Sequence, residues 1–151
     1  MTIPVRRPVF PRTDNLLGSI CIYSTSVTHV PGQHEQPILR VGELRPGQTK
    51  KFLLTCHGRE EEAFVVNHAG HLYAYVNRCL HVPMTMDWID NQFLTEDGQF
   101  ILCATHGACY RPDTGECVSG PPCGKFLIRV PLTVRGDEVF ASCPDEPSSG
   151  P

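Results

Sequence analysis

The chain has 151 residues, and its 13 Lys and Arg against 16 Asp and Glu give a formal net charge of −3 at pH 7. This near balance of charge excludes the strongly basic footprint of a nucleic-acid-binding protein. No apolar run approaches the roughly 18 residues that a transmembrane helix needs. The 14 Pro, 13 Gly, 8 Cys and 7 His indicate short strands and turns rather than long helices.

The first twenty residues are also unlike a secretory signal. They place Arg6, Arg7 and Arg12 among prolines, and no continuous apolar stretch follows these charges. We therefore expect a cytoplasmic protein. In that reducing compartment the eight cysteines are interpreted as metal ligands and as buried or free thiols before they are interpreted as disulfides.

Residues 1–36 are polar and rich in turn-forming residues. We expect them to form an N-terminal arm that packs on the domain or frays, in which residues 19–24 could make one strand. Residues 37–143 are expected to form the domain. The Pro- and Ser-rich residues 144–151 are expected to be a disordered tail.

From residue 38 the chain alternates short β-prone runs with turns. The clearest signal is a hairpin, because β-branched and aromatic residues at 63–67 and 72–76 flank a loop that contains Gly70. No sustained helical period of apolar residues occurs between 38 and 142. The predicted fold class is therefore all-β, with antiparallel strands. Further strands are expected at residues 38–41, 51–55, 100–103, 126–130 and 139–141.

Two short motifs each combine cysteine with histidine: Cys79-Leu80-His81 and Cys103-Ala104-Thr105-His106. Each follows a predicted strand, where a tight loop can aim both side chains at one point. Two such loops facing each other offer two thiolates and two imidazoles. This set admits a mononuclear zinc site or a 2Fe-2S cluster with two Cys on one iron and two His on the other. Zinc fingers commonly keep cysteines in one knuckle and histidines in the other, whereas both motifs here are mixed.

The mixed motifs resemble the signature of the Rieske family, which is C-x-H followed by C-x-x-H. The segment from His106 to Tyr110 is similar to the family's H-G-x-x-aromatic sequence. The segment from Thr114 to Pro122 looks like its T-G-x-x-x-x-G-P loop. The resemblance covers about residues 38–142, which is most of the chain.

The resemblance implies one 2Fe-2S cluster, with Cys79 and Cys103 as ligands of the inner iron and His81 and His106 as ligands of the outer iron. It also implies antiparallel sheets that carry a small cluster-binding subdomain formed by two loops. The Pro-containing loop that begins at Gly120 would shield the cluster from a third side. The added electron is expected on the outer iron, where the imidazole edges face solvent.

The chain also departs from one branch of the family. High-potential Rieske proteins of respiratory complexes carry two more cysteines, joined in a disulfide, at the positions of Met84 and Thr105. They carry a serine at the position of Ala108, whereas Tyr110 matches their tyrosine. The linker between the two motifs is longer than is usual in the family's ferredoxins. Its extra residues, 85–93, are expected to cover the cluster or to dock a partner.

The resemblance therefore implies a one-electron carrier of the low-potential type and not an enzyme, with no catalytic residue. Its expected partners are a reductase and a terminal oxygenase or similar redox enzyme, and neither nucleic acid nor a membrane. One alternative is an accessory small subunit of a reductase, resembling the small subunit of assimilatory nitrite reductase. Another is a zinc-stabilised interaction domain.

The remaining chemistry-bearing residues are given simpler interpretations. A disulfide between Cys117 and Cys123 is conceivable, but buried thiols are favoured in a cytoplasmic chain. Trp88 is interpreted as a core residue under the long loop in preference to an exposed docking residue, because core is the commoner fate. Residues 60–62, all Glu, are expected at a solvated strand edge or as a weak docking patch. Four cysteines without a partner motif are interpreted as packing or surface residues: Cys21, Cys56, Cys109 and Cys143. Five histidines are expected in loops: His29, His34, His57, His68 and His71.

Overall fold

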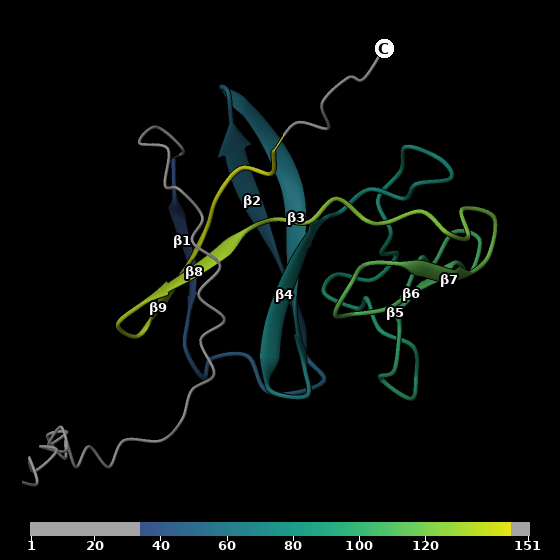
Figure 1. The fold of residues 1–151 in the computed structure, drawn as a ribbon, viewed down its shortest axis with the longest axis horizontal. Coiled ribbons are helices and arrows are strands. Elements are labelled where there is room, and N and C mark those ends of the chain that lie inside the picture. The colour runs from purple at the N-terminus through teal and green to yellow at the C-terminus, as the bar shows by residue number, and fades with distance from the viewer. Residues whose placement is uncertain (1–33, 146–151) are drawn as a thin grey trace, which may run out of the picture. The chain divides into compact units, whose positions relative to one another are not determined.

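The computed structural model describes residues 34–145, which form three antiparallel sheets (Figure 1). The expectations for the N-terminal arm, including those for Cys21 and His29, and for most of the tail lie outside these residues. Within residues 34–145 there are strands and no helices, so the all-β prediction is confirmed. Accordingly, this part of the chain has no helix with the length and hydropathy needed to cross a membrane.

Each sheet has three strands. The first, in the order β1-β9-β8, contains β1 (Gln36–Arg40), β8 (Leu132–Arg135) and β9 (Glu138–Ala141). The second, in the order β2-β3-β4, contains β2 (Thr49–Cys56), β3 (Arg59–His68) and β4 (His71–Val76). The third, in the order β5-β6-β7, contains β5 (Ile101–Leu102), β6 (Cys109–Tyr110) and β7 (Cys117–Ser119).

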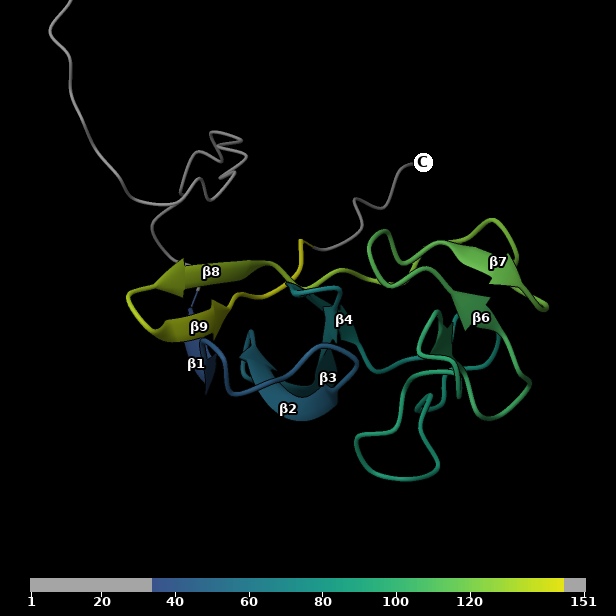
Figure 2. The same cartoon turned by 90° about the horizontal axis from the view of Figure 1, so that it is seen from below.

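The β2-β3-β4 sheet lies between the other two, and β3 and β4 contribute buried side chains to a core on each of its faces (Figure 2). Successive side chains of a strand point to opposite faces. In β3, Ala63 and Val65 therefore enter the core shared with the β1-β9-β8 sheet, whereas Phe64 and Val66 enter the core on the other face. The predicted hairpin at residues 63–76 is this β3–β4 pair, and its β-branched and aromatic residues supply both cores.

The predicted strand at residues 126–130 is wrong. The segment makes isolated bridges at Phe126 and Arg129, and the closing hairpin is instead formed by β8 and β9. Leu127 packs in the core next to the third sheet, and Val130 packs in the core next to the first. The alternating apolar pattern therefore marks a segment that crosses from one core to the other.

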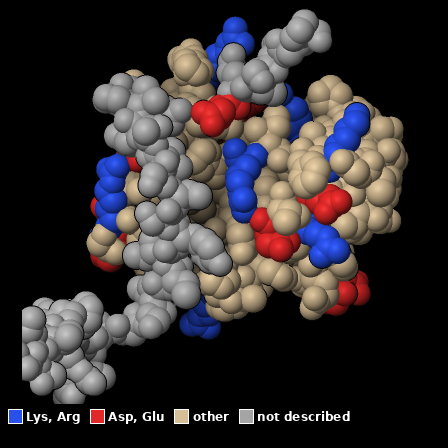
Figure 3. Space-filling model, in the orientation of Figure 1, with Lys and Arg blue, Asp and Glu red and all other residues tan. Residues whose placement is uncertain are grey.

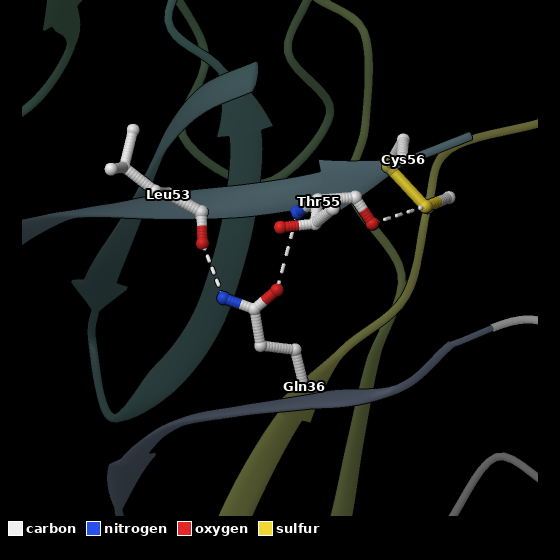
Figure 4. Close-up of a disulfide and its surroundings, with 5 residues drawn as sticks. Gln36, Leu53, Thr55 and Cys56 are labelled. Carbon is white, nitrogen blue, oxygen red and sulfur yellow. Dashed lines mark hydrogen bonds between the residues drawn. A yellow bond between two sulfur atoms is a disulfide. The ribbon is translucent and has the colours of Figure 1, made fainter. Parts of the chain in front are cut away.

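A disulfide joins Cys56, the last residue of β2, to Cys143, which follows β9 (Figure 4). The interpretation of these two cysteines as unpaired packing or surface residues is therefore wrong. The two lie 87 positions apart in the sequence and share no local motif, so only the tertiary fold brings them together. The bond links the β2-β3-β4 sheet to the segment that leaves the β1-β9-β8 sheet.

The side chain of Gln36 reinforces the same junction. Its amide group donates to the carbonyl of Leu53, and its side-chain carbonyl accepts from the amide of Thr55 at 3.2 Å (Figure 4). Gln36 lies on β1 and both partners lie on β2. The glutamine thereby satisfies backbone groups at the free edge of β2, as a further strand would.

Removing the disulfide is expected to destabilise the domain. A bond that closes a loop of this length restricts the unfolded chain, and its loss typically costs about 2–4 kcal/mol of unfolding free energy. Denaturant unfolding of the Cys56→Ser/Cys143→Ser double variant under oxidising conditions measures the difference. Cys123→Ser, at an exposed free cysteine, is the matched control and should unfold like the unsubstituted protein. Equal unfolding midpoints for all three proteins would contradict the structural role of the disulfide.

Candidate metal centre

The first candidate loop begins directly after β4. The amide of Cys79 donates to the carbonyl of Met84 at 2.8 Å, which closes the chain into a tight loop. The Cys79 side chain is buried in the core, whereas His81, at the outer end of the loop, is exposed. One closure thus points the sulfur inward and the imidazole outward.

The second candidate loop repeats this arrangement after β5. The amide of Cys103 donates to the carbonyl of Ala108 at 2.8 Å, and the amide of Gly107 donates back to the carbonyl of Cys103 at 2.9 Å. Gly107 has a φ of 72°, in the left-handed region that favours glycine. Cys103 is fully buried and His106 is exposed, so the two loops have the same polarity.

The two loops lie against each other and bring the four predicted ligands together in two pairs. The amide of Ala104 donates to the carbonyl of Met86 at 2.8 Å and so joins the loops. The rings of His81 and His106 lie edge to face with centroids 4.9 Å apart. The thiols of Cys79 and Cys103 lie within hydrogen-bonding reach of each other.

Backbone amides surround both sulfurs. Burial raises the pKa of Cys79, but hydrogen bonds from the amides of Val82 and His81 and from the side chains of Cys103 and Tyr110 together leave this pKa below its ordinary value. Burial and the neighbouring Cys79 thiol raise the pKa of Cys103, although backbone amides also reach its sulfur. Amide donors stabilise negative charge on sulfur, which a metal-bound thiolate carries.

Tyr110 and Ala108 line the inner side of the same loops. The hydroxyl oxygen of Tyr110 lies 4.0 Å from Sγ of Cys79, and burial together with the nearby Cys79 raises the pKa of this tyrosine. Ala108 is buried but offers no hydroxyl group. Of these two residues, only Tyr110 therefore offers a hydroxyl group near a candidate ligand sulfur. A serine at position 108 would add a second hydroxyl group.

Two glycines of the loop from Thr114 to Pro122 are required by close packing. A Cβ atom on Gly115 would lie 2.7 Å from Cε1 of Tyr75, and one on Gly120 would lie 2.8 Å from Cα of Ala108. Both glycines also have positive φ. The contact at Gly120 places the start of the Pro-containing loop directly against the second candidate loop. Sequence reasoning identified these glycines only as parts of a motif.

The other cysteines near this loop are separate thiols. Cys117 is buried and its Sγ donates to the carbonyl of Ser119 at 3.2 Å, whereas Cys123 is exposed. Cys109, at the start of β6, is also a free thiol. The preference for free thiols over a bond between Cys117 and Cys123 agrees with the structure, but the expectation that both are buried is wrong for Cys123.

The residues present fit a 2Fe-2S cluster, since they form one pair of sulfurs and one pair of imidazoles. Two ligands on each of two irons is the arrangement that a Cys2His2 cluster requires. Within residues 34–145 no group of three His, Cys, Asp or Glu side chains is arranged to hold one metal ion. Among the same residues, the hydroxyl of Thr105 is a buried polar group without a hydrogen-bond partner. Thr105 lies between Cys103 and His106, where a bound cluster would supply sulfide acceptors.

Comparison with known proteins agrees with this geometry. The sequence profile of the family described as Rieske [2Fe-2S] domain matches residues 34–134. A cytochrome b6-f complex iron-sulfur subunit from Chlorobaculum thiosulfatiphilum is 31% identical over 111 residues, which cover 72% of this chain and 53% of that protein. The chain thus spans about half the length of this curated relative.

Solved structures share the fold at lower sequence identity. The ferredoxin of carbazole 1,9a-dioxygenase from Nocardioides aromaticivorans IC177 is 21% identical, with a TM-score of 0.53 over 71% of this chain and 95% of the ferredoxin. The terminal oxygenase of carbazole 1,9a-dioxygenase from Novosphingobium sp. KA1 is 22% identical, with a TM-score of 0.60 over 75% of this chain and 30% of the oxygenase. The chain therefore belongs to the Rieske [2Fe-2S] domain family, and its cofactor is one 2Fe-2S cluster.

Proposed function

We propose that the chain is a Rieske-type ferredoxin, a one-electron carrier without catalytic activity of its own. In this proposal Cys79 and Cys103 hold the inner iron, and His81 and His106 hold the outer iron. The observation that carries the proposal is the shared polarity of the two loops, with buried sulfurs and exposed, adjacent imidazoles. When bound, the cluster supplies a one-electron couple. The chain holds the sulfurs away from water and presents the imidazole edges to a partner.

The proposed partners are a reductase as electron donor and a terminal oxygenase or similar redox enzyme as acceptor. The likeness to the carbazole dioxygenase ferredoxin, which extends over 95% of that protein, supports this assignment. A related solved structure is a complex of a reduced oxygenase with an oxidised ferredoxin. The cytoplasm is the compartment proposed from the sequence. The Cys56–Cys143 disulfide weighs against it, because disulfides persist mainly in oxidising compartments.

A second candidate is an accessory or electron-transfer subunit of a larger complex. The 31% identity to a subunit of the cytochrome b6-f complex favours it, and so does the Tyr110 hydroxyl beside Cys79. Purification of the tagged chain from its native source distinguishes the two. A carrier is recovered alone, and a subunit is recovered in stoichiometric complex.

Substitution of the sulfur ligands tests the proposed function. Protein purified without oxygen should contain iron and sulfide, not zinc, and should show the visible and electron paramagnetic resonance spectra of a 2Fe-2S centre. Cys79→Ser or Cys103→Ser should abolish these spectra and lower the folded yield, because one iron loses a ligand. Cys123→Ser, at a thiol outside the proposed ligand set, should keep both spectra. Full spectra in either ligand variant would contradict the assignment, and stoichiometric zinc in the unsubstituted protein would favour a zinc-stabilised domain.

A serine at position 108 should raise the reduction potential. Its hydroxyl could donate to a cluster sulfide, and this bond strengthens when the reduced cluster gains negative charge. A hydrogen bond to a charged group contributes roughly 1.5–3 kcal/mol. About 1.4 kcal/mol corresponds to about 59 mV for one electron.

Only the difference between the oxidised and reduced states changes the potential, so we expect Ala108→Ser to raise it by some tens of millivolts. Voltammetry in one buffer measures the shift. Ala69→Ser, the same substitution in the exposed β3–β4 turn, is the control. A potential that stays the same or falls, with the cluster intact, would mean that residue 108 does not face the sulfides.

Removal of the Thr105 hydroxyl should have the opposite effect. Thr105→Val keeps the side-chain volume but deletes the donor that has no protein partner in this structure. If a cluster sulfide accepts this hydroxyl, the valine variant loses a bond that favours the reduced state, and the potential falls by some tens of millivolts. Thr105→Ser keeps the hydroxyl and should stay near the original value. Equal potentials for the valine and serine variants would show that the hydroxyl does not reach the cluster.

A further inference from the structure

The single tryptophan of the chain is on the surface. Trp88 is 74% exposed and Ile89 is 60% exposed. The interpretation of Trp88 as a core residue is therefore wrong. The core under this loop is filled instead by Met86 and Phe93, which are fully buried on either side of the exposed pair. A large apolar side chain left in water between two buried ones is available for contact with another molecule.

The N-terminal side of the Trp88–Ile89 pair is held by a buried polar network. Asp87 is buried, and its Oδ1 accepts from Nδ2 of Asn77 at 2.8 Å. Its other oxygen, Oδ2, lies 3.1 Å from Nζ of Lys51. The amide of Met86 donates to Oδ1 of Asn77 at 2.9 Å. Asp87 is thus fixed from two directions, one of them the β2 strand.

The C-terminal side of the Trp88–Ile89 pair is also held on strand β2. Oδ1 of Asp90 lies 2.6 Å from Nζ of Lys51. The Lys51 ammonium group therefore pairs with Asp87 before the exposed pair and with Asp90 after it. The amide of Lys51 donates to Oδ1 of Asn91 at 2.6 Å, and the hydroxyl of Thr49 donates to the carbonyl of Asn91. The ring of Phe93 then stacks on Phe64 at a centroid distance of 4.0 Å. A side chain presented on a loop anchored at both ends loses little freedom when it binds.

The anchored loop is continuous with the candidate metal centre. The carbonyl of Met86, two residues before Trp88, accepts a hydrogen bond from the amide of Ala104 in the second candidate loop. Met84 is exposed, and its carbonyl accepts the hydrogen bond from the amide of Cys79 that closes the first candidate loop. Trp88 therefore follows, two residues along the chain, the hydrogen bond that joins the two candidate loops.

The charge around the pair is negative. Lys51 lies within 3.5 Å of three carboxylates, those of Glu62, Asp87 and Asp90. One cation against three anions leaves an excess of negative charge, and the Asp90 side chain is 84% exposed. On the face drawn in Figure 3, acidic and basic side chains are interspersed and neither sign covers a large area. The three carboxylates around Lys51 therefore give the Trp88–Ile89 pair a negatively charged surrounding.

We propose that Trp88 and Ile89 form a docking point for a redox partner whose electron-exchange surface is apolar and ringed by lysine or arginine side chains. The proposal rests on the proposed electron-carrier function. The apolar pair enters the partner's apolar surface, and Asp90 meets its cationic rim. Exposed aromatic residues on a fixed support are typical of the few positions that dominate binding at protein interfaces.

Electron transfer to a basic redox protein tests the proposal. The probe is ferric mitochondrial cytochrome c, whose haem edge is apolar and ringed by lysines, mixed in a stopped-flow instrument with the reduced, cluster-loaded chain. We expect Trp88→Ala to lower the second-order rate constant about tenfold at low ionic strength. Trp88→Phe should restore most of the rate. Asp90→Asn should lower the rate at low ionic strength and reduce its dependence on salt.

Val134→Ala is the matched control, because Val134 is an exposed apolar residue of β8, in a different sheet. Its rate constant should equal that of the unsubstituted protein. Each variant is also checked by its electron paramagnetic resonance spectrum and reduction potential, which the docking role leaves unchanged. These readouts separate the two proposals, because a chain without the spectrum fails as a carrier before docking is measured.

Two results would overturn the docking proposal while leaving the carrier function intact. The first is a Trp88→Ala variant that reduces cytochrome c as fast as the unsubstituted protein at every ionic strength. The second is an unsubstituted protein that sediments as a dimer which Trp88→Ala converts to a monomer, since the exposed pair would then be covered by a second copy of the chain.

Discussion

The candidate metal centre depends on one repeated hydrogen bond, in which the amide of a cysteine closes its own loop. Cys79 donates to Met84 and Cys103 donates to Ala108, both at 2.8 Å. Each closure turns a sulfur into the core and leaves the neighbouring backbone amides free to face it. Because both loops have the same form, their contact pairs sulfur with sulfur on the inside and imidazole with imidazole on the outside. The environment of the centre is therefore asymmetric, because the cysteine side is buried and the histidine side is exposed.

Tyr75 of β4 makes one of the contacts by which the β2-β3-β4 sheet holds this unit in place. Tyr75 of β4 donates its hydroxyl to the carbonyl of Pro112 at 2.9 Å and lies against Gly115. Arg129 lies over the ring of Tyr75 and donates to the carbonyl of Asp113 at 2.6 Å. These contacts join the sheet to the turn that precedes the Pro-containing loop, so a larger residue at 115 would displace the turn on which that loop depends.

Local patterns in the sequence predicted the elements that are formed by neighbouring residues, namely a hairpin and two loops. The β3–β4 hairpin followed from β-branched and aromatic runs around Gly70, and the mixed Cys and His motifs identified the loops that the structure brings together. The remaining features depend on contacts between distant segments. The Cys56–Cys143 bond spans 87 positions, and the exposed Trp88 lies between Asp87 and Asp90, which both pair with the distant Lys51. Residues 126–130 carry a strand-like pattern because they serve two cores in turn.

The disulfide stabilises the sheets and does not cross-link the two candidate loops. The resemblance to the Rieske family implies that Met84 and Thr105 occupy the positions where the high-potential branch, from which this sequence departs, carries two cysteines joined across the cluster loops. Here the loops are joined by the hydrogen bond from Ala104 to Met86 and by packing, and the covalent link lies between the β2-β3-β4 sheet and the segment after β9. Reduction of the disulfide would therefore loosen the scaffold and leave the loop contacts in place. The loops can adjust around the cluster without breaking a covalent bond, whereas the sheets that orient them cannot separate while Cys56 and Cys143 are joined.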